Sequence, residues 1–203
     1  MVELERSLRD LARSNGVPGA AAAAGRLARR AADAGLVEVA YAHVGSPLGP
    51  LLVAATRRGL VRLSLDAAAR DEVLGELSAA VSPRVLEVPA RLDEARRQLD
   101  EYFEGSRRAF DLPLDLRLVD GFRRRVLATA EAIPFGSVAT YAEVAVQAGS
   151  ACAARAAGSA LAANPIPIVV PCHRVLRTGG KLGGYVGGLE RKRFLLELEG
   201  ARV

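Results

Sequence analysis

The stretch NPIPIVVPCHRV, residues 164–175, is an apolar run that is stiffened by three prolines and ends at a Cys-His-Arg group. Each proline fixes its own φ and pushes the preceding residue into extended geometry, so this stretch is not a helix. Its β-branched segment Ile168-Val169-Val170 is expected to be buried. The chain therefore holds the thiol of Cys172 on a rigid, buried support, which suits a nucleophile whose thiolate must be formed and aimed.

The alternative interpretation of Cys172 is a small core residue, because cysteine is among the most buried residue types. His173 favours catalysis, since the chain has only two histidines and two cysteines and one of each is adjacent here. Adjacent side chains of an extended chain point to opposite faces, so His173 can reach Cys172 only through a backbone turn or a bridging water. The residues alone leave both interpretations open.

Length and composition predict a cytoplasmic protein with one ordinary domain and a small one. The chain has 203 residues, of which 50% are hydrophobic, so a packed core is available. Cys152 and Cys172 provide no disulfide framework and no zinc-binding spacing, which favours a reducing compartment. No apolar run is long enough to span a membrane, and the charged N-terminal residues lack the apolar core of a signal peptide.

The positive charge lies in the half of the chain that carries Cys172. Residues 1–118 hold 17 arginines and 17 acidic residues, whereas residues 119–203 hold 11 basic and 6 acidic residues and so account for the net charge of +5. Such an excess is typical of a surface that binds a polyanion. The alternative is a general bias of composition, because only two of the 28 basic residues are lysines. Charge alone therefore supports DNA binding only weakly.

Hydrophobic periodicity and turn residues divide the chain into four parts. These are a helical N-terminal extension (1–36), an α/β domain (37–105), a linker (106–118) and a C-terminal domain (119–203). The extension is expected to contain two helices, one with Leu4, Leu8 and Leu11 and one at 20–34. The α/β domain is expected to have strands at 37–44, 51–56 and 60–65 and helices at 66–80 and 90–104. His43 lies in the first strand without a nearby thiol or acidic residue, and we interpret it as structural.

The C-terminal domain has the spacing of a helix-turn-helix. After a helix from Asp120 to about Ala132, we expect a helix at 137–148, a turn at Gly149-Ser150 and a second helix at 151–163, with Ser150 as its N-cap. On the second helix, the residues of the inward face are Ala154, Ala157 and Leu161, and those of the outward face are Cys152, Arg155, Ser159 and Ala162. A face of small side chains with one arginine suits close approach to a groove, but an Ala-rich packing helix with one solvated arginine fits equally well.

These segments together resemble the O6-alkylguanine-DNA alkyltransferases, the methylated-DNA–protein-cysteine methyltransferases. The matching residues are Asn164–Pro167, Pro171–Val175, Ile133–Gly136, Thr140-Tyr141, Ala153–Ala156, Gly183–Tyr185 and Leu195–Gly200. The match follows the order and spacing of the family through the C-terminal domain and fits the preceding domain loosely. The resemblance implies an α/β (α+β) fold, with a small ribonuclease-H-like sheet domain followed by a mostly helical domain that contains the helix-turn-helix.

The resemblance also assigns roles to single residues. Cys172 would be the nucleophile, His173 would take its proton through a water, and Glu199 would hold His173. Tyr141 would press on the phosphate of the target nucleotide and help to rotate it out, and it is also a candidate proton donor. The second helix would enter the minor groove, where Arg155 fills the gap left by the extruded base. The remaining expected contacts are Ala154 and Ser159 with DNA, and Asn164, Pro167, Tyr185, Val186 and Gly187 around the base pocket.

The implied reaction moves an alkyl group from O6-alkylguanine in double-stranded DNA to Cys172. Its product is a thioether that no step can reverse, so each molecule would act once. We expect no cofactor and no membrane partner, and we expect a monomer. No metal is expected either, because the N-terminal domain has too few cysteines and histidines for the zinc site of some family members. Activity on O4-alkylthymine stays open.

Three other functions remain to be distinguished. A damage-binding relative without activity would replace the nucleophile, typically with tryptophan, whereas this chain has Cys172 and no tryptophan. A Cys-His hydrolase would need an oxyanion hole and turnover, and His173 directly after the cysteine is poorly placed for a dyad. A plain helix-turn-helix regulator should bind a specific sequence and survive loss of Cys172.

Overall fold

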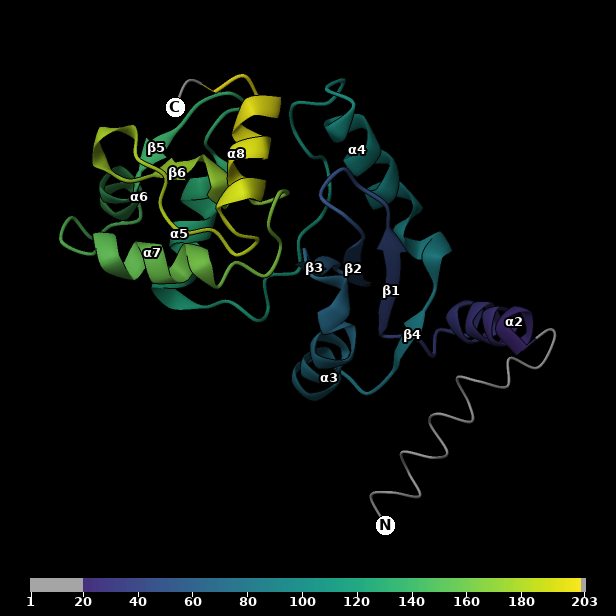
Figure 1. Ribbon diagram of the computed structural model, residues 1–203. Coiled ribbons are helices and arrows are strands. Elements are labelled where there is room, and N and C mark those ends of the chain that lie inside the picture. Colours follow the sequence, from purple (N-terminus) through teal and green to yellow (C-terminus); the bar gives the residue numbers. More distant parts are fainter. Residues whose placement is uncertain (1–19, 202–203) are drawn as a thin grey trace, which may run out of the picture.

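The computed structural model describes residues 20–201, in two halves joined by an extended segment (Figure 1). The expected helix with Leu4, Leu8 and Leu11 lies outside the described residues. The second helix of the extension is present as α2 (Ala20–Asp33). Its residue Ala28 packs with Val37 and Val88, so α2 lies against the sheet domain beside β4 (Val85–Glu87).

The N-terminal half is a mixed four-stranded sheet in the order β3-β2-β1-β4. Its other strands are β1 (Val39–Val44), β2 (Leu51–Thr56) and β3 (Gly59–Ser64). The three strands run antiparallel, as the hairpin signals predict, whereas β4 pairs with β1 in parallel. Strand β4 was not predicted from the sequence, because it has only three residues, none of them buried, and so shows no alternation.

Two helices cover the two faces of this sheet. Val39 and Leu52 point to α3 (Arg70–Ala80), whereas Val44 and Leu51 belong to the core under α4 (Asp93–Phe103). Short 3₁₀ turns at Ala67–Ala69 and Pro89–Leu92 precede the two helices. The expected helices at 66–80 and 90–104 are thus confirmed, and the sheet is buried on both sides.

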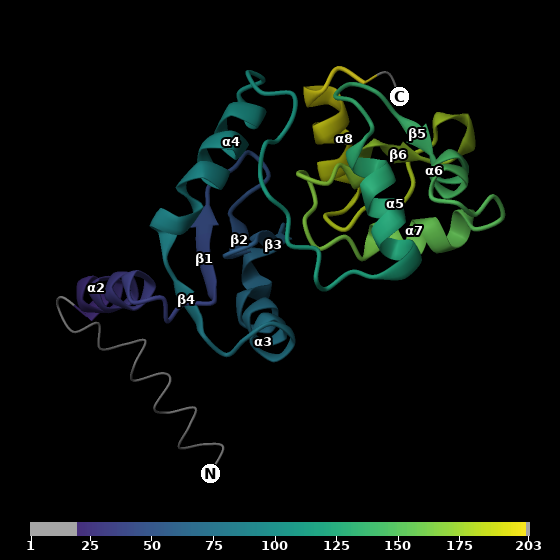
Figure 2. The same ribbon diagram turned by 180° about the vertical axis from the view of Figure 1, so that it is seen from behind.

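Residues 106–118, expected to be an inter-domain linker, pack closely on the first half, and we call this segment the strap. Its backbone extends the sheet at β3, where the amide of Leu60 donates to Pro113 O at 2.8 Å and the amide of Asp115 donates to Leu60 O at 2.7 Å. Gly59 makes this contact feasible, because a β-carbon there would lie 2.0 Å from Pro113 O. Figures 1 and 2 show the strap running between the two halves.

The C-terminal half is mostly helical (Figure 2). Its helices are α5 (Gly121–Glu131), α6 (Tyr141–Gln147), α7 (Ala154–Ala162) and α8 (Leu189–Leu198). Two short strands, β5 (Ala139–Thr140) and β6 (Val175–Leu176), pair in parallel. Turns of 3₁₀ type lie at Cys172–Arg174 and Thr178–Gly180.

The helix-turn-helix is present, but its helices are shorter than the sequence predicts. The first helix does not begin at Ser137, because Ala139 and Thr140 pair with β6 and Thr140 then caps α6 through a capping box with Glu143. The second helix begins at Ala154 instead of Ala151, and Ser150 makes no side-chain cap. Tertiary pairing therefore overrides the helical periodicity at the first boundary.

One cluster of buried apolar residues runs through both halves. It joins Leu99 and Tyr102 of α4 to Leu127 of α5 and Leu195 of α8. The β3 amide of Leu63 also donates to Pro165 O at 2.8 Å, so the sheet domain supports the 164–175 stretch directly. Among residues 20–201, no helix is long and apolar enough to cross a membrane.

Candidate active site

The stretch that precedes Cys172 is buried and held by an asparagine. Asn164 donates through Nδ2 to Val170 O at 2.8 Å and accepts from the Ile166 amide at 3.0 Å. These bonds pin a turn in which Ile168 has φ 75°, a left-handed conformation that is unfavourable for a β-branched residue. Asn164 thus fixes the turn that leads to Cys172.

The backbone turns at the cysteine. After the extended run, Cys172–Arg174 forms a single 3₁₀ turn, in which the amide of Arg174 donates to Pro171 O at 3.0 Å. This turn removes the opposite-face geometry of an extended chain, so the side chains of Cys172 and His173 need not diverge. The structure therefore supplies one of the two conditions under which His173 can act on the thiol.

Cys172 is 4% exposed, and its thiol is largely protonated in the resting protein. Burial raises its pKa to about 11, while the Asn164 side chain and the charge of Lys192 act in the opposite direction. A thiol with this pKa is not a nucleophile at neutral pH until a base removes its proton. The site must therefore provide that base.

His173 is completely buried and suited to be the base. Its Nε2 lies 2.8 Å from Glu199 Oε1, and burial lowers the pKa of the imidazole, which keeps it neutral. Because the carboxylate only accepts hydrogen bonds, Nε2 carries the proton and Nδ1 keeps its lone pair. Nδ1 has no hydrogen-bond partner within residues 20–201, so it is available to receive a proton.

Glu199 follows the last residue of α8 and is the centre of a buried cluster of polar side chains. Arg174 donates to both of its oxygens, from Nε at 2.8 Å and from Nη2 at 2.9 Å, and the Gly136 amide donates to Oε2 at 3.2 Å. The Tyr102 hydroxyl donates to Oε1 at 2.7 Å. Burial opposes ionisation of Glu199, but the bonds from His173 and Arg174 outweigh it and lower the pKa to about 2.

Three residues of this neighbourhood were not singled out by sequence analysis as site residues. Arg174 could have been identified from the sequence, because it lies within the matching motif. Lys192 is completely buried, donates to Val175 O at 2.6 Å and has its pKa lowered to about 8 by burial. Lys192 could have been identified by its residue type, because it is one of only two lysines in an arginine-rich chain. Tyr102 comes from the other half of the chain, and no local pattern points to it.

A pocket of about 590 Å³ opens between the start of α6, α7 and the glycine-rich loop at 177–188. Tyr141, Arg155, Tyr185 and Val186 line it, together with Ala154. The hydroxyl of Tyr141 donates to Gly184 O at 3.4 Å. The structure thus brings together five of the residues that the resemblance assigns to DNA or to the base.

Gly183 allows Tyr141 to lie against the glycine-rich loop. A β-carbon at Gly183 would stand 2.4 Å from the Tyr141 hydroxyl oxygen. Burial and the nearby Cys172 raise the pKa of the Tyr141 hydroxyl. Tyr141 consequently stays protonated and able to donate a hydrogen bond.

Four of the residues expected to contact DNA or to surround the base lie outside the pocket wall. One is Asn164, which holds the turn before Cys172. Ser159 is exposed on α7 and bonds to Arg155 O at 3.3 Å, Pro167 is buried and bridges to Val170, and Gly187 packs against Leu65. Pro167 and Gly187 therefore shape the surroundings of the site, and neither lines the pocket itself.

Helix α7 presents the outward face that the sequence predicts. Arg155, Ser159 and Ala162 are exposed, and Cys152 is exposed just before the helix. The inward face is formed by Ala157, Ala160 and Leu161. The inward assignment of Ala154 was wrong, since this residue is only half-buried and lines the pocket.

Both halves of the chain match models of one protein family. Residues 121–201 match the DNA-binding domain of 6-O-methylguanine DNA methyltransferase, and residues 39–116 match its ribonuclease-like domain. The methylated-DNA–protein-cysteine methyltransferase of Mycobacterium tuberculosis H37Rv is 41% identical over 163 residues, which cover 80% of this chain and 93% of the relative. The constitutive methylated-DNA–protein-cysteine methyltransferase of Bacillus subtilis 168 is 38% identical over 160 residues, which cover 78% of this chain and 94% of the relative.

Solved structures show the same likeness. The crystal structure of Mycobacterium tuberculosis O6-methylguanine methyltransferase has a TM-score of 0.68 at 40% identity, with 81% of this chain and 94% of that chain covered. The complex of the M. tuberculosis protein OGT with DNA has a TM-score of 0.69 at 40% identity, with 79% and 92% covered. With its buried thiol, the adjacent histidine and glutamate and the two matching domains, this chain belongs to the family of the methylated-DNA–protein-cysteine methyltransferases.

Proposed function

We propose that this protein repairs DNA by moving the alkyl group of O6-alkylguanine in duplex DNA onto its own Cys172, once per molecule. The observation that carries the proposal is the arrangement of three buried side chains. The protonated thiol of Cys172 and the neutral imidazole of His173 belong to adjacent residues of one buried turn, and that imidazole is fixed by an ionised glutamate. This is the arrangement needed to generate a thiolate only inside a dry site.

The reaction begins with a proton transfer. The Cys172 proton moves to Nδ1 of His173 through a bridging water, and Glu199 stabilises the imidazolium that forms. The charge of Lys192 and the Asn164 amide stabilise the thiolate against the cost of burial. Each group holds or moves a proton at a stated atom, so no metal ion or cofactor is required.

The second step is a direct displacement at carbon. The thiolate attacks the alkyl carbon, a C–S bond forms and the C–O6 bond breaks with its electron pair going to guanine. The leaving base needs a proton or a hydrogen bond, for which the protonated hydroxyl of Tyr141 is placed on the pocket wall. No group in the site can cleave the resulting thioether, so the protein is consumed.

The pocket at the start of α6 is proposed to receive the extruded base. Its volume of about 590 Å³ lies in the range typical of small-molecule sites, and Tyr185 and Val186, which line it, would contact the guanine. Arg155 on its rim would occupy the space that the base leaves in the duplex, while Ala154 and Ser159 allow close approach of α7 to the minor groove. All proposed groups belong to one chain, so we propose that the protein acts as a monomer.

The proposed function is tested by measuring the loss of O6-methylguanine from DNA. A duplex with one O6-methylguanine is mixed with increasing amounts of protein, and the remaining O6-methylguanine is counted by mass spectrometry of the nucleosides. We expect a loss equal to the moles of protein added, with no further loss over time, and no loss with Cys172→Ser. Tight binding without loss would contradict the transfer and establish a damage sensor, whereas loss in excess of protein would establish a turning-over enzyme.

A further inference from the structure

Tyr102 links the N-terminal half of the chain to the reaction centre. It lies near the end of α4, is completely buried, and donates from its hydroxyl to Glu199 Oε1 at 2.7 Å, across 97 residues of sequence. The same oxygen lies 2.8 Å from His173 Nε2. One carboxylate oxygen therefore connects a tyrosine of the sheet domain with the proposed base.

The ring of Tyr102 is held by three aromatic neighbours. Its centroid lies 5.4 Å from that of Phe103, 5.2 Å from that of Phe110 in the strap and 6.2 Å from that of Phe135 in the other half. Aromatic pairs at such distances favour defined relative orientations. The hydroxyl is thus aimed by packing from α4, the strap and the C-terminal half together.

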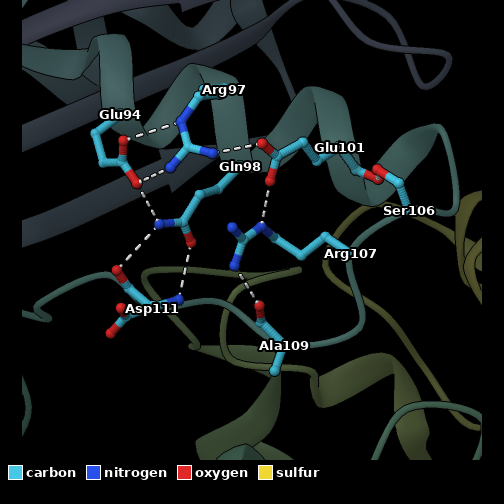
Figure 3. Close-up of polar contacts among 8 residues, drawn as sticks. All are labelled: Glu94, Arg97, Gln98, Glu101, Ser106, Arg107, Ala109 and Asp111. Atoms are coloured by element: carbon cyan, nitrogen blue, oxygen red, sulfur yellow. Dashed lines mark hydrogen bonds and ion pairs between the residues drawn. The ribbon is translucent and has the colours of Figure 1, made fainter.

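A polar network connects α4 with the strap (Figure 3). Gln98 donates to Asp111 O at 3.1 Å and accepts from the Asp111 amide at 2.8 Å. Arg107 donates to Glu101 Oε2 at 2.7 Å and to Ala109 O at 2.8 Å. Because Glu101 and Tyr102 are adjacent on α4, the network holds the backbone from which the tyrosine projects.

The Tyr102 hydroxyl acts as a permanent donor to Glu199. Burial, together with the negative charge of Glu199, raises the pKa of Tyr102 far above its ordinary value, so the hydroxyl keeps its proton. A donor on Oε1 does two things. It fixes the rotation of the carboxylate so that Oε1 faces His173, and it takes up part of the charge that would otherwise act on Nε2–H.

We propose that Tyr102 is a positioning residue of the transfer reaction, which sets the orientation of Glu199 and thereby the basicity of His173. Its effect on transfer rate rests on the function proposed above, whereas its effect on His173 does not. The sheet domain, on this proposal, contributes a side chain to the chemistry in addition to supporting the fold.

Several charged or titratable groups face His173 and must be kept constant in a test. Those groups are Glu199 and Lys192 of the α8 region, Arg174 of the 3₁₀ turn, Tyr185 of the glycine-rich loop, whose ring is edge-on at 6.4 Å, and the adjacent Cys172. Tyr102→Phe leaves all of them in place and removes one hydroxyl. The aromatic packing of the ring is also kept.

The first readout is the titration of His173 by NMR of the imidazole nitrogens in the full chain. The protein has only two histidines, and the exposed His43 serves as an internal reference. Without the hydroxyl, Glu199 becomes a stronger acceptor, so we expect the pKa of His173 to rise by about 0.3 to 1 unit.

Tyr41→Phe is the matched control. It removes a buried tyrosine hydroxyl that accepts a bond from Arg70 Nη2 at 2.6 Å, on the other face of the sheet and away from Glu199. This variant should leave the titration of His173 as in the wild type. A similar shift of the His173 pKa in both variants would show that loss of any buried tyrosine hydroxyl loosens the fold, and it would overturn the proposal.

The second readout is the single-turnover rate of methyl transfer at saturating duplex. Because the Glu199 carboxylate is no longer held facing His173, we expect Tyr102→Phe to transfer about 3- to 10-fold more slowly at saturating duplex. Binding of the duplex should be unchanged, and the acid limb of the pH–rate profile should move to higher pH with the pKa of His173. A lower melting temperature with an unchanged His173 pKa would make Tyr102 merely structural and overturn the proposal. A wild-type protein that transfers no methyl group would defeat the proposed function, while the His173 titration would still decide the role of Tyr102.

Discussion

The buried cluster around Glu199 and the pocket beside Arg155 differ in what holds their side chains. In the cluster, Tyr102, His173 and Arg174 all bond to one carboxylate and none of them is free to move. In the pocket, Arg155 is exposed on α7 and makes no side-chain bond to the described residues. On the proposed function, the reacting groups are therefore preorganised in the protein, whereas the surface that recognises DNA becomes complete only when DNA binds.

This difference leads to a rule that mutations can test. Changes in the buried cluster should alter stability and chemistry together, because each group there compensates a desolvated charge. Changes in the pocket should alter function with little change in stability, since exposed side chains contribute little to folding.

The largest effect is expected for Glu199→Gln. The change leaves Arg174 without a buried counter-ion, so we expect a loss of about 3 to 5 kcal/mol in the free energy of unfolding and no measurable transfer. Urea denaturation and the nucleoside assay measure the two effects. Glu190→Gln, at an exposed ion pair with Arg193, should stay within about 0.5 kcal/mol. Equal losses in the two variants would remove the contrast between buried and exposed carboxylates.

At acidic pH, the free energy of unfolding should change differently in the wild type and in Glu199→Gln. The pKa of Glu199 is lowered to about 2 from an ordinary value of 4.5, so its stabilising contribution is complete above about pH 4.5 and is lost as the pH falls toward 2. The wild type should therefore lose about 3 kcal/mol more than Glu199→Gln across this window. If the free energy of unfolding depends on pH in the same way in both proteins, the partners of Glu199 do not lower its pKa.

An intermediate effect is expected for Lys192→Met. Removing the buried ammonium raises the pKa of Cys172 further, and we expect transfer at pH 7 to slow about tenfold. Because the pKa of Lys192 is about 8, its charge fades above that pH in the wild type, and the two rates should converge there. Lys181→Met, at an exposed position, is the control. A rate difference that does not depend on pH would assign Lys192 to packing alone.

In the pocket, Arg155→Ala should affect function without affecting the fold. We expect about tenfold slower transfer from duplex DNA, because the space left by the extruded base is no longer filled, and a free energy of unfolding within about 0.5 kcal/mol of the wild type. Arg58→Ala, at an exposed turn of the sheet domain, should change neither quantity. A large loss of stability in Arg155→Ala would place this residue with the buried cluster instead.

The smallest effect is expected for Cys152→Ser. Cys152 is exposed before α7 and lies outside the pocket, so both transfer and stability should match the wild type. Slower transfer in the nucleoside assay would show that this thiol takes part in DNA contact or in the reaction.

The sequence predicts what is local and misses what depends on long-range contact. The motif around Cys172, the strands of the hairpin and the outward face of α7 follow from residue type and spacing. The start of α6 could not be predicted, because Thr140 pairs with Leu176 far along the chain. Tyr102 was missed for the same reason, since 97 residues separate it from Glu199. The 3₁₀ turn at Cys172–Arg174 was left open, because an extended run and a turn begin with the same prolines.

The most direct test of the central claim is to measure the mass of the protein after the reaction. Cys152→Ser leaves Cys172 as the only thiol, and this variant is incubated with excess duplex carrying one O6-methylguanine before intact-mass analysis and peptide mapping. The account predicts the gain of a single methyl group per protein, located on Cys172 and unchanged by longer incubation. An unchanged mass after demonstrated binding, or a methyl group on any other residue, would contradict it.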